Sequence, residues 1–218
     1  MDTRASYDSA ARAYAEHLAG ELAHKPLDRH LLNRFAEETR GRGLVADFGC
    51  GPGHVARYLH EQGVQMIGTD LSPGMIEVAA GLHPGLDFRV DDMTRADFAD
   101  ASLAGIVSFY SIVHFEAAEL GAIFQQMRRV LVPGGLALVA FHVGDQVVHL
   151  DDLFGAPVSL DFRFQVPGKV VEALRMAHLD VIEHTERAPY EGVEYPSRRC
   201  YLLARAHDRP GGAPDLLE

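Results

Sequence analysis

Apolar and polar residues recur along the chain with two periods, and the period changes from segment to segment. Between residues 7 and 19, Tyr7, Tyr14 and Leu18 lie at helical spacing, so this stretch is predicted to be a helix. LVADFG (44–49) is short and mostly apolar, which indicates a buried strand. The same patterns predict helices at 7–19, 28–40, 54–62, 72–82 and 117–131, and strands at 44–49, 64–70, 86–92, 103–111 and 136–143.

The connections between these segments are short and carry capping and turn residues. Ser72 is the predicted N-cap of the helix that follows it, with Pro73 in the first helical position, and Gly63 closes the preceding helix. PGG (133–135) is predicted to be a turn. Strand and helix therefore alternate from 44 to 143, which predicts a parallel sheet covered by helices on both faces.

The C-terminal part of the chain departs from this alternation. Residues 166–188 predict a helix and then a strand, and 198–206 predict a last strand, antiparallel to its neighbour because only a loop separates the two. We find no internal repeat and no separate second domain. The chain divides into a helical N-terminal segment (1–40), one α/β domain (41–207) and a tail rich in proline and glycine (208–218), which we expect to be flexible.

Composition and charge limit what such a domain can do. The 218 residues suffice for one sizeable domain, and 47% of them are apolar, enough for a core. A formal net charge of −11 argues against a general nucleic-acid binder, which needs a basic face. Cys50 and Cys200 are far apart in the sequence and indicate reduced thiols rather than a disulfide framework. Without a secretory segment or a window of about 20 apolar residues, we expect a soluble, cytoplasmic protein.

The glycine-rich loop GCGPG (49–53) falls where the first strand of the sheet meets the helix after it, the usual place for a ligand in such folds. A dinucleotide loop reads G-x-G-x-x-G, but here the third glycine, Gly53, comes one position early. Asp47 precedes the loop, and its carboxylate would repel a diphosphate. A ligand with an ammonium and a sulfonium group, such as S-adenosylmethionine, would be attracted. The loop therefore favours S-adenosylmethionine over a dinucleotide.

Asp70 adds a second argument for a nucleoside ligand. It ends the second strand, 21 positions after Gly49, where a carboxylate can accept hydrogen bonds from both ribose hydroxyls. The alternative is that Asp70 caps the next helix, but Ser72 fills that role better. We therefore predict that Asp70 binds the ribose.

Four segments together resemble the successive motifs of class I S-adenosylmethionine-dependent methyltransferases, in particular the branch that acts on small molecules in bacteria. They are VADFGCGPG (45–53), IGTDLSPGMIEVA (67–79), FRVDDM (88–93) and LVPGGLALVAF (131–141). The resemblance covers about residues 40–145. It implies a Rossmann-like, seven-stranded, mostly parallel sheet with one antiparallel strand, helices on both faces, and an N-terminal helical lid (1–40) over the cofactor.

The resemblance also implies roles for single residues around the cofactor. Asp47 orients the methionine end, and Asp70 holds the ribose. In FRVDDM, either Asp91 or Asp92 accepts a hydrogen bond from the adenine amino group, and we favour Asp92. The other predicted contacts are Gly49, Gly51 and Gly53 beside the methionyl and ribosyl parts, Leu71, Met75 and Met93 near the adenine, and Tyr7 and Tyr14 on the lid helix. For the two tyrosines, which share a helical face, plain packing is the alternative.

Methyl transfer needs little acid–base chemistry, because the sulfonium activates the methyl group and alignment supplies much of the acceleration. The fourth strand ends in SFYSIVH (108–114), which places four polar side chains at the mouth of the site: Ser108, Tyr110, Ser111 and His114. Ser108 is a predicted cofactor contact. His114 has a pKa range suited to a general base, although a structural histidine fits the sequence equally well. Tyr110 and His142 complete the catalytic candidates, Tyr110 as a wall of the pocket rather than a proton carrier.

A metal site is the alternative reading of the region after the fifth strand. His142, Asp145, His149 and Asp151 have side chains that bind metals, but the loop that carries them is not constrained. We interpret them as solvated loop residues and predict no metal. A metal-dependent, catechol-type methyltransferase is the minor alternative.

The sequence therefore predicts a methyltransferase that uses S-adenosylmethionine to methylate an oxygen or nitrogen atom of a small molecule. It is expected to act as a monomer or homodimer, without a nucleic-acid or membrane partner. Enzymes that methylate a nucleic-acid base usually carry an Asn/Asp-Pro-Pro-aromatic motif where this chain has FYSI (109–112). A nicotinamide-dependent oxidoreductase and a non-catalytic S-adenosylmethionine-binding module are the two alternatives left open.

Overall fold

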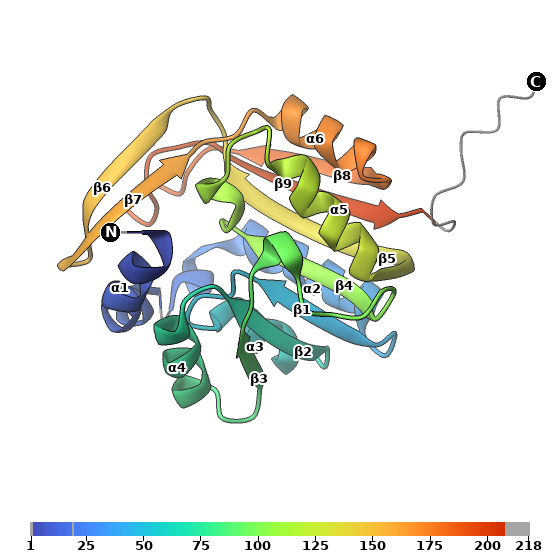
Figure 1. Ribbon diagram of the computed structural model, residues 1–218, viewed down its shortest axis with the longest axis horizontal. Coiled ribbons are helices and arrows are strands. Elements are labelled where there is room, and N and C mark those ends of the chain that lie inside the picture. The colour runs from blue at the N-terminus through green and yellow to red at the C-terminus, as the bar shows by residue number, and fades with distance from the viewer. Residues whose placement is uncertain (1, 19, 208–218) are drawn as a thin grey trace, which may run out of the picture.

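A seven-stranded sheet forms the centre of the molecule, in the order β3-β2-β1-β4-β5-β9-β8 (Figure 1). The computed structural model describes residues 2–18 and 20–207, so the predicted tail at 208–218 lies outside the described residues. All strands of the sheet run parallel except β9, which is antiparallel to both neighbours. The strands are β1 (Leu44–Phe48), β2 (Gln65–Asp70), β3 (Asp87–Val90), β4 (Leu103–Phe109), β5 (Leu131–His142), β8 (Leu179–Arg187) and β9 (Arg199–Ala206). The predicted sheet with one antiparallel strand is confirmed.

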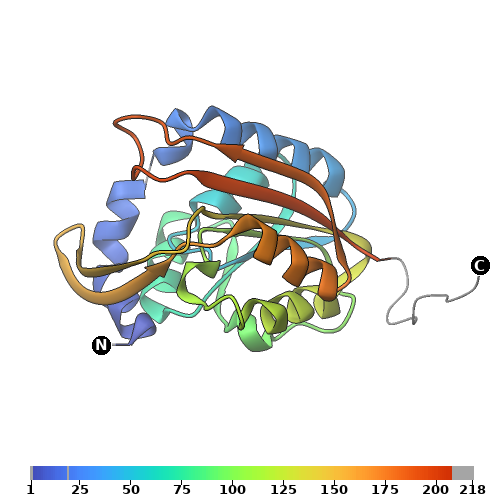
Figure 2. The ribbon, with the colours of Figure 1, turned by 90° about the horizontal axis from the view of Figure 1, so that it is seen from above.

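Helices cover both faces of this sheet (Figure 2). On one face, α2 (Pro26–Thr39) and α3 (His54–Glu61) bury apolar side chains such as Phe35 against the strands. On the other face, α5 (Leu120–Val130) and α6 (Pro167–Met176) do the same. The two apolar clusters hold the sheet rigid from both sides, which fixes the loops at the carboxyl ends of its strands.

The first helix, α1 (Thr3–Leu18), has a different position. It packs against α4 (Pro73–Leu82) and against a hairpin of β6 (Val147–Leu153) and β7 (Ala156–Arg163) (Figure 1). A separate apolar cluster joins Ala10 of α1 to hairpin residues. Short 3₁₀ turns complete the chain: η1 (Glu21–His24), η2 (Met93–Arg95) and η3 (Ile112–His114). α1 thus rests on two edges of the domain rather than on the sheet.

The hairpin corrects one prediction, because His149 and Asp151, which were interpreted as solvated loop residues, lie in β6. Exposed and half-buried positions alternate over residues 147–151, and a two-stranded hairpin is only marginally stable by itself. Its apolar side, with Leu153, Val158 and Leu160, is buried by α1. The strands therefore depend on a helix that lies far away in the sequence, which a local pattern does not reveal.

The predicted turn at 133–135 is also corrected, since these residues lie inside β5. Leu131 pairs with Leu103, and the regular register starts at Leu136 opposite Gly105, with a shift between the two. Gly134 has a φ of +71°, in the left-handed region that glycine adopts without strain. The segment is therefore an irregularity within one strand and not a break between two elements.

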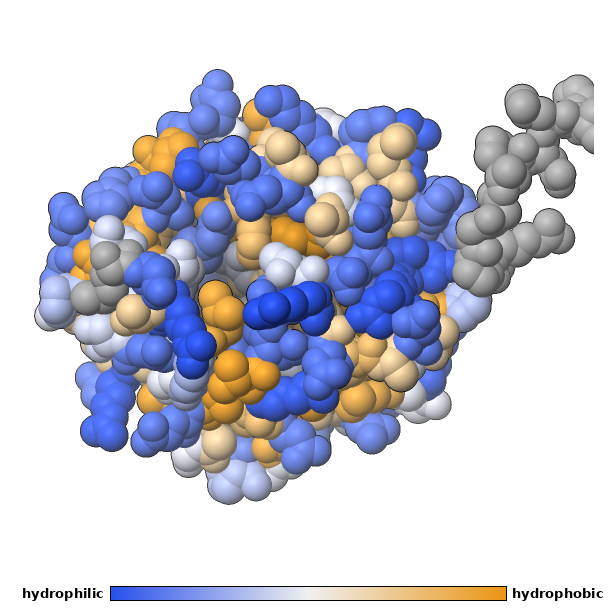
Figure 3. Space-filling model, viewed as in Figure 1, coloured by the Kyte–Doolittle hydropathy of each residue, from blue (hydrophilic) through white to orange (hydrophobic). Residues whose placement is uncertain are grey.

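On the face shown in Figure 3, apolar side chains lie in small areas separated by hydrophilic ones. Within residues 2–18 and 20–207, no helix is long and apolar enough to cross a lipid bilayer.

Candidate cofactor and active site

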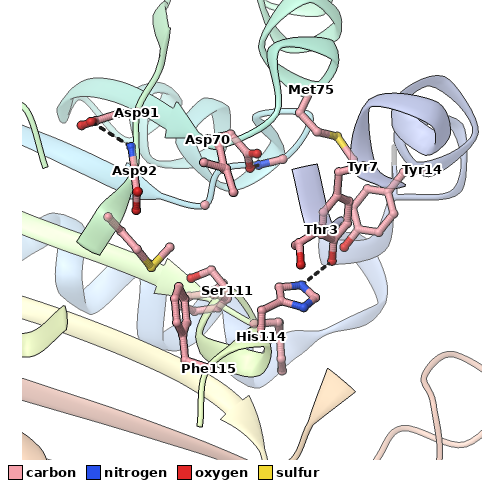
Figure 4. Close-up of a pocket in the computed structure, with 16 residues that line it drawn as sticks. Thr3, Tyr7, Tyr14, Asp70, Met75, Asp91, Asp92, Ser111, His114 and Phe115 are labelled. Atoms are coloured by element: carbon pink, nitrogen blue, oxygen red, sulfur yellow. Dashed lines mark hydrogen bonds between the residues drawn. The ribbon is translucent and has the colours of Figure 1, made fainter. Parts of the chain in front are cut away.

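A cavity opens at the carboxyl ends of the central parallel strands, next to α1 (Figure 4). Most of the predicted site residues line it: Tyr7, Tyr14, Gly49, Gly51, Asp70, Leu71, Met75, Asp92, Met93, Tyr110 and His114. Asp91 and Ser111 also line it. The sequence analysis missed Thr3, Phe109 and Phe115, of which the two phenylalanines flank residues already singled out in the SFYSIVH segment. Four predicted residues lie outside the cavity wall: Asp47, Gly53, Ser108 and His142.

The glycine loop folds tightly around the end of β2. The N–H groups of Gly49 and Cys50 donate to the Thr69 carbonyl oxygen at 2.8 and 2.9 Å. Gly49 has a φ of +73°, and a Cβ there would lie 2.4 Å from the Ser111 Cβ, so only glycine fits. A Cβ on Gly53 would lie 2.6 Å from the Phe88 ring. Gly53 therefore serves the packing of the loop on β3, whereas Gly49 and Gly51 border the cavity.

Asp70 presents its carboxylate to the cavity in a fixed orientation. One oxygen accepts a hydrogen bond from the Gly51 N–H and the other from the Ser72 N–H, both at 2.9 Å. Burial raises the pKa of this carboxyl group, and the two N–H groups oppose that shift. Each oxygen keeps a free lone pair, so the side chain can still accept bonds from two neighbouring hydroxyls.

Asp91 and Asp92 differ in how their carboxylates are used. Asp91 accepts hydrogen bonds from the backbone N–H groups of Asp92 at 2.9 Å and Asp97 at 3.1 Å, so it holds its own loop together. One Asp92 oxygen accepts bonds from the Thr94 N–H and hydroxyl, and the other lies 3.3 Å from the Arg95 Nε. In Figure 4 the Asp92 side chain extends toward the cavity, while the Asp91 carboxylate points away from it.

Asp47 lies under the loop instead of in the cavity wall. Asp47 is 2% exposed, and its Oδ2 atom has no hydrogen-bond partner. Burial raises the pKa of this carboxyl group to about 7, and the charge of Asp70 acts in the same direction. A buried acceptor without a partner is costly, so this oxygen is suited to a donor or cation brought by a ligand.

The N-terminal helix is tied to the rest of the site by a polar contact that the sequence analysis missed. One Asp8 oxygen accepts hydrogen bonds from the Ser72 hydroxyl at 2.6 Å and from the Gly74 N–H at 2.9 Å. Ser72 is at the same time the N-cap of α4, as predicted, through the Met75 N–H at 3.0 Å. α1 is therefore anchored at the start of α4 and carries Tyr7 and Tyr14 over the cavity.

His114 connects α1 with the loop after β4. Its Nε2 lies 2.8 Å from the Tyr7 hydroxyl, and its Nδ1 lies 3.1 Å from the Asp161 carbonyl oxygen. Burial lowers the pKa of His114 to about 4, so the ring is neutral at pH 7. Ser108, by contrast, is fully buried and shares a hydrogen bond with Ser111, which places Ser108 behind the cavity wall.

Tyr110 and His142 belong to a second group of side chains beside the cavity. Tyr110 is among the residues that line the cavity, but its hydroxyl lies 3.0 Å from the Tyr201 hydroxyl. The His142 Nδ1 lies 2.7 Å from the Ser197 hydroxyl, and the ring stacks on Phe164 at 5.1 Å. Burial lowers the pKa of His142 to about 4. The structure therefore does not bring His142 into the cavity with His114, because its ring turns toward the loop before β9.

The metal-type residues after β5 are spread out as well. His149 contacts Asp151 at 3.2 Å and Asp161 at 2.7 Å on the exposed hairpin, apart from His142. In the part of the chain that the structure describes, one group has its potential ligand atoms within 4.8 Å of one another: His184, Glu186 and Cys200. There the Arg198 guanidinium lies 3.0 Å from Glu186, which is the arrangement of an exposed ion pair.

Part of this chain is similar to proteins of known families. A family model described as a methyltransferase domain matches residues 45–135. Two curated relatives are a malonyl-[acyl-carrier protein] O-methyltransferase of Serratia marcescens, 28% identical over 70% of this chain and 58% of its own, and a demethylmenaquinone methyltransferase of Beutenbergia cavernae, 30% identical over 64% and 57%. The chain thus spans little more than half the length of these relatives.

A solved structure extends the comparison to the fold. It is the Burkholderia thailandensis 1,6-didemethyltoxoflavin-N1-methyltransferase with bound 1,6-didemethyltoxoflavin and S-adenosylhomocysteine. The two chains superpose with a TM-score of 0.71 over 94% of this chain and 87% of the other, at 19% identity. At that identity the likeness concerns the fold.

Proposed function

Because the chain belongs to the class I S-adenosylmethionine-dependent methyltransferases, we propose that it transfers the methyl group of S-adenosylmethionine to an oxygen or nitrogen atom of a small-molecule acceptor. The observation that carries the proposal is the cavity itself. It joins the glycine loop and Asp70 to the tyrosines of α1 and to His114. Groups suited to bind the cofactor thus lie on one side of the cavity. The side chains of α1 and His114 lie on the other side, where we propose that the reaction takes place.

The residues present fit this cofactor. Asp70 offers two oriented oxygens to the ribose hydroxyls, and Gly51 lets a ligand approach the backbone closely. The unpartnered oxygen of Asp47 suits the ammonium group at the methionine end. Asp92 and Met93 line the side where we propose that the adenine lies. When bound, S-adenosylmethionine supplies a methyl group that its sulfonium has already activated.

The remaining residues of the cavity position the reactants and keep water out. We assign α1 the role of the lid, since Tyr7 and Tyr14 close the cavity opposite Asp70 and Asp92 (Figure 4). His114 and the Tyr7 hydroxyl are two of the polar groups beside the space that we propose for the acceptor. His142 and Ser108 have no direct part in this proposal, because they lie behind the wall.

The acceptor is proposed to be a small molecule and not a nucleic acid. The net charge of −11 disfavours a polyanionic partner, whose binding needs lysines and arginines to replace counterions. The Beutenbergia relative, named for demethylmenaquinone, is consistent with a small acceptor. We propose that the protein acts as a monomer or homodimer.

Calorimetry with purified protein tests the cofactor half of the proposal. S-adenosylhomocysteine should bind and NAD should not; binding of NAD alone would refute the proposal and favour an oxidoreductase. Asp70→Ala should weaken S-adenosylhomocysteine binding by about 1–3 kcal/mol through the lost hydrogen bonds.

An acceptor screen tests the catalytic half. Formation of S-adenosylhomocysteine that depends on an added small molecule is the expected result. Normal cofactor binding with no product from any acceptor would support a non-catalytic binding module instead.

A further inference from the structure

The side of the cavity away from the proposed adenosine site is built from aromatic rings. In Figure 4, Asp91 and Asp92 lie on one side, and Tyr7, Tyr14 and His114 lie on the other. The ring centroids of Tyr7 and Tyr14 are 6.0 Å apart, and those of Tyr7 and His114 are 5.3 Å apart, both nearly edge to face. Such a wall packs well against a flat, apolar acceptor.

The charges around this space disfavour an anion. The cavity is lined by three aspartates and, among the described residues, by neither lysine nor arginine. Two cations nearby are already paired. The Lys25 Nζ lies 5.7 Å from the Tyr110 ring centroid but only 2.6 Å from Glu21. Arg163 lies 3.7 Å from Asp161. A carboxylate or phosphate in the cavity would therefore find no counter-ion among the lining side chains, which makes its burial costly.

A hydrogen-bond chain fixes where a proton can go. The Asp161 carbonyl oxygen can only accept, so the Nδ1 of His114 carries the hydrogen and Nε2 carries the lone pair. Tyr7 then donates its hydroxyl hydrogen to Nε2 at 2.8 Å. The Tyr7 oxygen keeps lone pairs that can accept a hydrogen bond from a ligand. Together, Tyr7 and His114 form a neutral pair in which the Tyr7 oxygen is free to accept a hydrogen bond.

We infer, on the basis of the proposed function, that the acceptor is an uncharged aromatic molecule that reacts through a hydroxyl group or an aromatic N–H, and that its proton leaves through Tyr7 to His114. A lone pair of the acceptor atom forms the bond to the methyl carbon while the carbon–sulfur bond breaks and leaves its electron pair on sulfur. The acceptor proton passes to the Tyr7 oxygen as the Tyr7 proton passes to Nε2, and His114 then releases it to water.

The basicity of the pair agrees with this class of acceptor. Burial holds the pKa of His114 near 4 and raises that of Tyr7, so the pair is a weak proton acceptor. A methylated hydroxyl or aromatic N–H is strongly acidic and gives its proton to a weak base. A methylated aliphatic amine holds its proton too tightly for such a route.

Three probes with the same aromatic body test the acceptor class by binding: 2-naphthol, 2-naphthoic acid and 2-naphthylmethylamine. Each is titrated into the complex with S-adenosylhomocysteine at pH 7.5, after binding of S-adenosylhomocysteine itself has been established. 2-Naphthol should bind about tenfold more tightly than the acid, because the acid buries an unpaired charge. Tighter binding of the acid or the amine, or no binding of any probe, would overturn the inference.

Variants test the part that Tyr7 plays. Tyr7→Phe keeps the ring but removes the accepting oxygen, so it should weaken 2-naphthol binding about three- to tenfold when both proteins are saturated with S-adenosylhomocysteine. Tyr58→Phe is the matched control, since the Tyr58 hydroxyl donates to Asn33 outside the cavity. Unchanged 2-naphthol affinity in Tyr7→Phe would contradict the assigned contact. If the cofactor product does not bind to the native protein, the proposed function fails and not only this inference.

Discussion

The carboxyl group of Asp47 is buried in the folded protein, and one of its oxygens has no hydrogen-bond partner. Its pKa of about 7 lies above the ordinary value of 3.8 because of burial. The folded protein therefore keeps this proton at a pH where the unfolded chain has released it. As a result, the stability that the protonated Asp47 carboxyl group gives the fold is lost as the pH rises from about 4 to 7. This cost is the reason why we propose a cationic group of the ligand as the partner of Asp47.

Asp47→Asn should separate these two effects. Without cofactor, the variant should gain unfolding free energy relative to the native protein as the pH rises from 5 to 7, by about 1.4 kcal/mol per pH unit. With cofactor, it should bind S-adenosylhomocysteine more weakly, since the amide carries no charge. Urea unfolding at several pH values and calorimetry provide the measurements, with the exposed Asp87→Asn as control. Unchanged affinity would show that the carboxylate does not serve the ligand.

The neighbouring pair Asp91 and Asp92 can be distinguished with a modified ligand. S-Inosylhomocysteine has an oxygen in place of the adenine amino group. The native protein should prefer S-adenosylhomocysteine, and Asp92→Ala should lose most of that preference, about tenfold, because the hydrogen-bond acceptor is gone. Asp91→Ala should keep the preference but lower the free energy of unfolding, since Asp91 accepts two backbone N–H groups of its loop. The reverse pattern would assign the adenine contact to Asp91.

At the residue scale, the sequence located residues of the cavity most directly where a short motif determines both the backbone conformation and the direction of the side chain. Gly49 and Asp70 follow directly from strand ends, and the cavity contains both. His142 also stands at a strand end, but its ring bonds to Ser197, 55 positions later in the chain. The direction of such a side chain depends on a distant loop, so the sequence pattern could not supply it.

At the scale of elements, α1 and the β6–β7 hairpin depend on each other. The helix was predicted from its apolar spacing, whereas the hairpin was missed because its apolar side is completed only by α1. Their shared cluster is small and separate from the two clusters on the sheet, so it should open more easily than the rest of the domain. The lid is therefore expected to move together with the hairpin.

Leu160→Ala tests this coupling, since Leu160 is fully buried between the hairpin and α1. We expect faster amide hydrogen exchange in residues 3–18 and 147–163, and weaker binding of S-adenosylhomocysteine, with little change elsewhere. Leu174→Ala removes an equally buried leucine of α6 and should instead lower global stability by about 2–5 kcal/mol. Equal exchange in α1 for both variants would show that the lid does not rest on the hairpin.

At the scale of the whole molecule, a buried ionic cluster joins the second helix to the C-terminal part of the chain. Arg187 contacts Asp28 at 2.7 Å, 159 positions away, and Glu194 at 2.6 Å. The side chains of both acids are 1% exposed. Alternation of strand and helix was enough to predict the sheet, but no local pattern indicates partners so far apart. The cluster fixes α2 to the loop between β8 and β9, next to the wall formed by Tyr110.

Arg187→Met should therefore destabilise the protein by about 3–5 kcal/mol, because it leaves two buried carboxylates with less compensation. Burial alone would raise the pKa of Glu194, but the hydrogen bonds from Arg187 and the Tyr190 N–H, together with the charges of Arg199 and Arg187, outweigh it and hold the pKa at about 2. The native protein thus keeps this stabilisation above pH 4.5 and loses it as the pH falls toward 2; in the variant the pKa of Glu194 is less depressed, so the variant should lose less stability over this pH range. Arg198→Met, which breaks an exposed pair with Glu186, should cost at most about 1 kcal/mol. Urea unfolding between pH 3 and 7 measures both effects. Similar losses of unfolding free energy in the two variants would mean that the buried cluster does not hold α2 to the C-terminal part of the chain.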